Sequence, residues 1–194
     1  MPASYILNAH LSFPRIRRAE MEDLPAIHEL HARSMRALGR RHYESRLIER
    51  FLETVGTLDE RIVEDGTYLV AQTPGGEIVG SGGWSERVPR YIDAVEGRPA
   101  MGRGIRARIR SVFVHPEFAR QGLGRCLMAG AEGAVRARGH RDIAIDATLA
   151  GVPLSIAMGY RNVAPLVARL PGGESMTFIH LRKQLVRTIR ARAA

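Results

Sequence analysis

The sequence predicts one α/β domain with a mixed sheet that is covered by helices on both faces. Three observations support this fold class: the chain has 194 residues, 45% of them are hydrophobic, and helix-like and strand-like segments alternate along it. A chain of this length buries about 70% of the surface of its unfolded state, which suffices for one core. The expected order is β-α-α-β-β-β-α-β-α-β-β, without an internal repeat or a dividing linker.

The first half of the chain predicts a strand and two helices. The short strand covers residues 16–18 and is followed by Glu22 and Pro25, which are typical of a helix start. Apolar residues then recur at helical spacing as far as Gly39, where the first helix ends. A second helix is expected over about 43–55 by the same criterion.

The rest of the chain returns to strand periodicity, interrupted by two helices. Residues 86–104 contain Pro, Gly and Arg with little periodicity, so we expect a long surface loop there. The remaining expected elements are a hairpin over 67–72 and 77–84, a strand over 109–114, a helix over 122–138, a strand over 142–147, a helix over 153–158, and a hairpin over 163–170 and 175–182.

The chain is strongly basic, with 29 Lys and Arg against 20 Asp and Glu and a formal net charge of +9. All of the basic residues except Lys183 are arginine. This charge attracts anions such as phosphates or nucleic acid, but a solvated face combined with codon bias accounts for it equally well. The arginines lack interleaved aromatic residues and no DNA- or RNA-binding motif is present, so a nucleic-acid partner is not favoured.

Several classes of protein are excluded by composition. Nothing approaches 18 uninterrupted apolar residues, so we expect no membrane-spanning helix, and residues 1–15 lack the pattern of a secretory signal. The single cysteine, Cys126, cannot form an internal disulfide, and the histidines lack metal-site spacing. We therefore expect a cytoplasmic protein without a metal ion.

The most informative segment is Arg110-Ser-Val-Phe-Val-His-Pro-Glu-Phe-Ala-Arg-Gln-Gly-Leu-Gly-Arg-Cys-Leu-Met. A strand runs into a loop, and Gly122 and Gly124 open an amphipathic helix. Free N–H groups at a helix start, together with the helix dipole, form a site for phosphate or pyrophosphate. Arg120 and Arg125 add charge there. A helix start at which glycine only relieves crowding is the alternative interpretation of this pattern alone.

The same segment resembles the acyl-CoA signature of the GNAT superfamily of N-acetyltransferases, in which a strand ending in Val-x-Pro precedes [Q/R]-x-x-G-x-[G/A] and a helix. The first strand and two helices, the Gly75-Gly76 hairpin and Ala157-Met158-Gly159-Tyr160 also fall at equivalent places. The resemblance covers residues 15–183, with 1–14 as an N-terminal extension and 184–194 as a basic C-terminal tail. It implies a mixed, mostly antiparallel central sheet flanked by helices on both faces.

The resemblance implies that acetyl-CoA is the co-substrate. Backbone amides of the loop would then bind the pyrophosphate, and the main chain of the preceding strand would bind the pantetheine arm like an added strand. The sheet would splay after that strand. Ala119 stands where the motif usually has Gln or Arg, which should weaken the site without abolishing it. The residues expected to contact acetyl-CoA are Phe113, Val114, Arg120, Gln121, Gly122, Leu123, Gly124 and Arg125.

The catalytic groups depart from the family pattern. Leu154-Ser155 stands where many members have Phe-Tyr, so Ser155 is the candidate donor of a proton to the leaving thiolate. The strand that often carries a catalytic glutamate offers Arg108 and Arg110 instead. Glu86 and Asp146 are therefore the candidate bases, each acting through water. A backbone N–H near Val114 is expected to hold the oxyanion.

Other reactive residues have structural interpretations. We expect Tyr160 and Trp84 to pack in the core, His115 to end a strand, and Cys126 to fill the core as a small side chain. The resemblance places the acceptor between residues 23–55 and the 86–104 loop. The polar candidates of the first segment are His28, His31, His42 and Tyr43. The arginines between 98 and 110 either favour an anionic acceptor or flank the cofactor.

Together these residues predict an N-acetyltransferase that transfers the acetyl group of acetyl-CoA to a primary amine of a small molecule or protein. The amine would attack the thioester directly in a ternary complex. The alternative is a non-catalytic CoA-binding sensor or scaffold, because the usual tyrosine and glutamate are missing. Dimers are frequent in the family, so a homodimer is expected by analogy.

Overall fold

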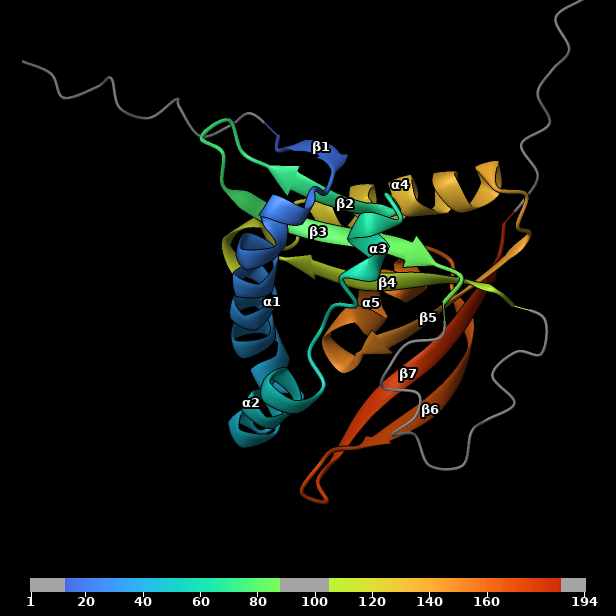
Figure 1. The fold of residues 1–194 in the computed structure, drawn as a ribbon. Coiled ribbons are helices and arrows are strands. Elements are labelled where there is room, and N and C mark those ends of the chain that lie inside the picture. Colours follow the sequence, from blue (N-terminus) through green and yellow to red (C-terminus); the bar gives the residue numbers. More distant parts are fainter. Residues whose placement is uncertain (1–12, 88–104, 186–194) are drawn as a thin grey trace, which may run out of the picture.

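Seven strands form one mixed sheet between two layers of helices in the computed structural model, which describes residues 13–87 and 105–185 (Figure 1). The strand order is β1-β2-β3-β4-β5-β7-β6. Every neighbouring pair is antiparallel except β4 and β5, which are parallel. This confirms the predicted mixed, mostly antiparallel sheet. The strands are β1 (Arg15–Arg18), β2 (Tyr68–Gln72), β3 (Ile78–Ser85), β4 (Ala107–Val114), β5 (Asp142–Thr148), β6 (Arg161–Arg169) and β7 (Ser175–Gln184).

Helices cover both faces of the sheet. Residues of α1, α2 and α3 pack on one face, and those of α4 and α5 pack on the other. α3 has no counterpart among the expected elements because its four residues span only about one turn, too short for a periodic pattern. Most of the expected 86–104 loop lies outside the described residues. The helices are α1 (Leu24–Leu38), α2 (Ser45–Thr54), α3 (Arg61–Glu64), α4 (Leu123–Ala137) and α5 (Val152–Ala157).

The long helix α4 attaches to the sheet through one apolar stripe. Leu123, Leu127, Ala131 and Val135 recur every four residues and are buried, because positions i and i+4 share one helix face. Cys126 lies outside this stripe and is exposed. The expectation that Cys126 fills the core is therefore wrong.

The parallel pair β4–β5 is joined along only part of its length. Its register ends at Ile109 opposite Ile145, although β4 continues to Val114 and β5 to Thr148. Beyond that point the two strands diverge (Figure 1). The C-terminal half of β4 therefore has an unpaired edge inside the sheet, and the space beside it is open.

β4 also contains a bulge next to this opening. Arg110 pairs with Gly83 and Phe113 pairs with Ser81, so two residues of β4 lie opposite the single Gly82 of β3. Ser111, the first bulged residue, has a left-handed φ of 49°, which is uncommon for a residue with a side chain. Bulges locally redirect the backbone, and this one redirects it where the sheet opens.

Candidate active site

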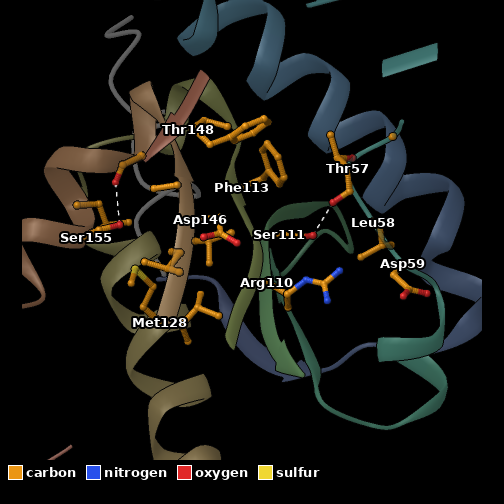
Figure 2. A pocket seen from close by; sticks show the side chains of 18 of the residues that line it. Thr57, Leu58, Asp59, Arg110, Ser111, Phe113, Met128, Asp146, Thr148 and Ser155 are labelled. Carbon is orange, nitrogen blue, oxygen red and sulfur yellow. Dashed lines mark hydrogen bonds between the residues drawn. The ribbon is translucent and has the colours of Figure 1, made fainter. Parts of the chain in front are cut away.

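A pocket occupies the opening between β4 and β5 (Figure 2). Asp146 of β5 and Ser111 of β4 face this space, with Ser155 of α5 on one side and Thr57 on the other. The pocket therefore crosses the sheet between its two helical layers, and most of its lining residues are apolar. Its polar lining residues are Thr57, Asp59, Arg110, Ser111, Asp146, Thr148 and Ser155.

The loop between β4 and α4 presents unsatisfied backbone donors. Within the part of the chain that the structure describes, no acceptor is found for the N–H groups of residues 120–125, and Cys126 is the first to donate, to the Gly122 carbonyl at 3.0 Å. Arg120 and Gly122 both have left-handed φ values, 66° and 90°, which turns successive N–H groups toward a common side. Because this loop leads directly into the N-terminus of the 15-residue helix α4, its N–H groups can bind an anion.

Glycine is favoured at positions 122 and 124 of this loop for different structural reasons. Gly122 needs its positive φ, and a Cβ there would meet nothing within 4 Å. A Cβ on Gly124 would lie 2.9 Å from Leu154 Cδ2 of α5 and 3.5 Å from Val114 Cγ2. Gly122 therefore shapes the loop, whereas Gly124 lets the first turn of α4 approach α5 and β4 closely.

Side chains around the loop add positive charge and fix its ends. Arg120 and Arg125 are exposed, and Gln121 Nε2 donates to the Glu117 carbonyl at 2.7 Å. His115 is buried, and its Nδ1 accepts the Glu117 N–H at 3.3 Å. His115 thus ends β4, as expected, and its side chain also caps the following turn.

The open edge of β4 offers its main chain to a ligand. The His115 N–H donates to the Val79 carbonyl of β3 at 2.9 Å. Because hydrogen-bonding directions alternate along a strand, the peptide groups of Phe113 also face β3, and those of Val114 face the opening. Phe113 lines the pocket with its ring, whose centroid lies 4.1 Å from that of His31.

Asp146 is a buried carboxylate at the pocket wall. Its side chain is 1% exposed, and Oδ1 accepts from His180 Nδ1 at 2.5 Å. Oδ2 lies 3.9 Å from Arg108 Nη1. The flanking histidine and arginine compensate the burial of its negative charge.

Ser155 lies in the same pocket. Its hydroxyl is buried and donates to the Gly151 carbonyl at 3.1 Å, within one turn of helix. The structure thus brings two of the three candidate catalytic side chains, Ser155 and Asp146, to one pocket (Figure 2).

Glu86, the third candidate, is not part of this pocket. Its side chain is 43% exposed and pairs with His140 Nε2 at 2.6 Å. Because β3 and β4 are antiparallel, Glu86 follows the end of β3 that lies beside the start of β4, whereas the pocket lies where β4 ends. Glu86 therefore lies toward the start of β4 and is absent from the pocket lining.

Other candidates from the sequence have structural roles. Tyr160 and Trp84 are buried in the core cluster beneath α4, as expected, and burial raises the pKa of the Tyr160 phenol. Tyr43 is buried, and its hydroxyl donates to the Thr177 carbonyl at 2.7 Å and accepts the Leu149 N–H at 2.8 Å. His28 and His42 are exposed.

His31 belongs to a buried polar network that the sequence patterns did not indicate. Its Nδ1 lies 2.7 Å from Thr57 Oγ1, and its Nε2 lies 2.8 Å from Ser81 Oγ and 3.1 Å from the Tyr68 hydroxyl. Burial lowers the pKa of His31, and the charge of His28 lowers it further, so the ring is neutral at pH 7. The sequence held one indirect signal of this region. The pair Gly82-Gly83 lies within a strand, where glycines often mark a bulge, and Gly82 lies opposite the β4 bulge.

The residues that the structure describes contain neither a candidate metal site nor a membrane-spanning helix. No group of three or more His, Cys, Asp or Glu side chains in residues 13–87 and 105–185 could hold a metal ion. In the same ranges, no helix has the length and apolar character needed to cross a membrane.

A mixed sheet that divides between two parallel strands, with a helix start and a pocket at the division, defines the GNAT class of acyltransferase fold. Residues 40–169 match the family model described as an acetyltransferase (GNAT) domain. The chain belongs to this family and is an acetyltransferase. No curated protein sequence matches it.

Solved structures share the fold at low sequence identity. A GCN5-related N-acetyltransferase from Rhodopseudomonas palustris is 21% identical with a TM-score of 0.68, covering 90% of this chain and 97% of that one. PaiA N-acetyltransferase from Thermoplasma acidophilum, solved with coenzyme A, is 17% identical with a TM-score of 0.61, covering 90% and 100%. YncA from Salmonella typhimurium, a putative acetyltransferase solved with acetyl-CoA, is 19% identical with a TM-score of 0.57, covering 94% and 100%.

Proposed function

We propose that this protein is an N-acetyltransferase that moves the acetyl group of acetyl-CoA to a primary amine of a small molecule or protein. The observation that carries the proposal is the unpaired half of β4, which connects the loop of free N–H groups to a pocket with a buried carboxylate. One end suits the pyrophosphate of the donor and the other suits an amine. Two of the similar structures were solved with coenzyme A or acetyl-CoA.

The donor side fits acetyl-CoA through its backbone. The free N–H groups of residues 120–125 would bind the pyrophosphate, with Arg120 and Arg125 adding charge. The Val114 peptide groups would bind the pantetheine arm as an added strand, whereas Phe113 would contribute its ring. Because backbone N–H groups do this work, the alanine at 119 should weaken the site without abolishing it.

The acceptor side supplies the proton chemistry. Asp146, through water, would take the proton that the amine must lose as nitrogen attacks the carbonyl carbon. A β4 backbone N–H near Val114 would stabilise the negative charge that develops on the carbonyl oxygen. The C–S bond then breaks, and the thiolate takes up a proton from water held near Ser155. No protein nucleophile is required, because amine and thioester meet directly.

A non-catalytic CoA sensor is the second candidate, and one observation favours it. The only hydroxyl that α5 directs to the pocket is that of Ser155, and it already donates to the Gly151 carbonyl. A serine hydroxyl is a poor acid, so α5 does not supply the tyrosine proton donor that many family members have there. A sensor would bind the donor and release no thiol.

Two measurements separate these proposals. Isothermal titration with acetyl-CoA should show binding, and no binding at millimolar donor would overturn both. A thiol-release assay across a panel of primary amines and amino-terminal peptides should then show turnover with at least one acceptor. Binding without turnover on the whole panel supports the sensor. Chromatographic mass determination tests the expected homodimer separately.

A further inference from the structure

Two hydrogen bonds hold the β4 bulge on the α1 side of the sheet. The Tyr68 hydroxyl donates to the Ser111 carbonyl at 2.6 Å, and the Ser111 hydroxyl donates to the Thr57 carbonyl at 2.5 Å. Tyr68 is fully buried, so its hydroxyl has no water to bond instead. Ser111 is thus held through both its side chain and its main chain, although its φ of 49° is unfavourable.

The first of these bonds fixes the direction of one peptide group. In a trans peptide, the C=O bond of one residue and the N–H bond of the next point in opposite directions. The Ser111 carbonyl points to Tyr68, on the side of β3 and α1. The Val112 N–H must therefore point away from them, toward the opening between β4 and β5.

The Tyr68 hydroxyl is itself held by a directed chain of hydrogen bonds. A carbonyl only accepts, so the single hydroxyl proton of Tyr68 goes to Ser111, and the Ser81 hydroxyl, 3.1 Å away, donates to Tyr68. Neutral His31 completes the chain, donating from Nε2 to Ser81 and accepting at Nδ1 from Thr57. Every hydroxyl and ring nitrogen in this chain has a partner, which favours one orientation of the whole network.

We propose that Tyr68 is a positioning residue: by holding the Ser111–Val112 peptide, it aims the Val112 N–H at the thioester carbonyl oxygen of the bound acyl donor. This inference rests on the proposed function, because it needs acetyl-CoA in the opening. Tyr68 does not touch the donor. It acts through the peptide, and Ser81, His31 and Thr57 hold it in place.

The infrared band of the acetyl carbonyl reports this polarisation directly. Acetyl-CoA labelled with carbon-13 at the carbonyl would be bound to the full chain without an acceptor, so that no turnover occurs. In the wild type, we expect the band below its position for free acetyl-CoA, because a hydrogen bond to the oxygen weakens the C=O bond. In Tyr68→Phe, the band should return at least halfway to the free position while the affinity for acetyl-CoA stays within about threefold.

Tyr43→Phe is the matched control, because it also removes a buried tyrosine hydroxyl bonded to backbone groups. Its band should stay at the wild-type position. If Tyr68→Phe does not fold, Ser111→Ala decides, because it removes the second hold on the bulge and should shift the band in the same direction by less. A wild-type band at the free position, or an unmoved band in the deciding variant, overturns the inference. Wild-type protein that binds no acetyl-CoA would instead overturn the proposed function.

Discussion

The two ends of the opening between β4 and β5 are built in different ways. The donor end is one continuous segment, residues 120–125, and its useful groups are backbone N–H bonds aimed by the left-handed φ values of Arg120 and Gly122. The pocket end takes side chains from α2, the α2–α3 connection, β4, α4, β5, α5 and β7. A local chain conformation makes the first, and tertiary packing makes the second.

This difference teaches which changes each end tolerates. Backbone donors do not depend on side-chain identity, so the loop can carry alanine at 119 and still bind an anion. The pocket has less redundancy, because its proposed chemistry depends on single side chains such as Asp146, which is held by His180 of another strand. Substitutions in the pocket should therefore lower turnover, and those in the loop should lower affinity.

The largest effect is expected from Asp146→Asn. The amide keeps the shape of the side chain but cannot take a proton from the amine, so turnover should fall by about 100-fold or more, with donor affinity nearly unchanged. Steady-state thiol release with the best amine of the panel measures this. The deficit should shrink as pH rises, because more of the amine is then already neutral in solution.

Asp142→Asn provides the matched control for that substitution. Asp142 is exposed at the start of the same strand and is absent from the pocket lining, so turnover should remain at the wild-type level. Equal losses in the two variants, or a deficit in Asp146→Asn that does not depend on pH, would remove Asp146 from the proposed chemistry.

The second largest effect is expected from Gly122→Asp. A Cβ at Gly122 meets no atom within 4 Å, and aspartate tolerates a left-handed φ better than most residues. The new charge would face the pyrophosphate, and like charges about 4 Å apart at a protein surface repel by several kcal/mol. Calorimetry should show donor affinity reduced by about 100-fold, while turnover at saturating donor changes little.

Gly139→Asp is a close control for the loop. Gly139 follows the other end of α4, with a φ of 86° and equally open surroundings. It should lose a similar amount of stability with donor affinity unchanged. If Gly139→Asp weakens donor binding as much as Gly122→Asp does, the loop is not the pyrophosphate site.

A smaller effect, on the pH dependence of stability, is expected from the neutral His31 that is hydrogen-bonded to Thr57 and Ser81. Burial and the charge of His28 lower the pKa of His31 in the folded state. Above about pH 6.5, the usual pKa of histidine, the His31 ring is therefore mostly uncharged in both the folded and the unfolded chain. Below that pH the unfolded chain takes up a proton that the folded state refuses. The free energy of unfolding should therefore fall by up to about 1.4 kcal/mol per pH unit as the pH drops.

The comparison with His31→Gln isolates this contribution. Chemical denaturation between pH 7 and pH 5 should give a shallower loss of stability for the variant than for the wild type, although the variant is less stable at pH 7. Parallel pH profiles for the two proteins would mean that His31 takes up a proton without unfolding.

Much of the fold could be predicted from local patterns. The turn at Gly75-Gly76 and the apolar residues that recur every four positions in α4 are features of short stretches of sequence. Both the hairpin and the helix form where expected. Cys126 was misplaced because apolar character alone does not decide on which side of a helix a residue lies. α3 was missed because one helical turn has no period to detect.

The pocket could be predicted only in part. Ser155 was predicted because it stands where many family members have tyrosine, and Asp146 because it lies near the end of its strand; both line the pocket. Glu86 does not line the pocket, because closeness along the chain does not reveal which end of an antiparallel strand faces the site. The hydrogen bonds around Tyr68 and Ser111 join residues up to 54 positions apart, as between Thr57 and Ser111, and only folding brings them together.

The smallest effect is expected from Ser155→Ala, and it tests how little the acid contributes. The Ser155 hydroxyl already donates to the Gly151 carbonyl, and a carbonyl in a helix keeps its own N–H partner when a serine is removed. Turnover should therefore fall by less than about fivefold, well below the 100-fold typical of a general acid. Thiol release at saturating substrates measures this. Ser155→Cys, of similar size and more acidic, should not exceed the wild-type rate if water protonates the leaving thiolate. A loss of 100-fold or more in Ser155→Ala would instead make Ser155 the proton donor and reduce the contrast between the two ends of the opening.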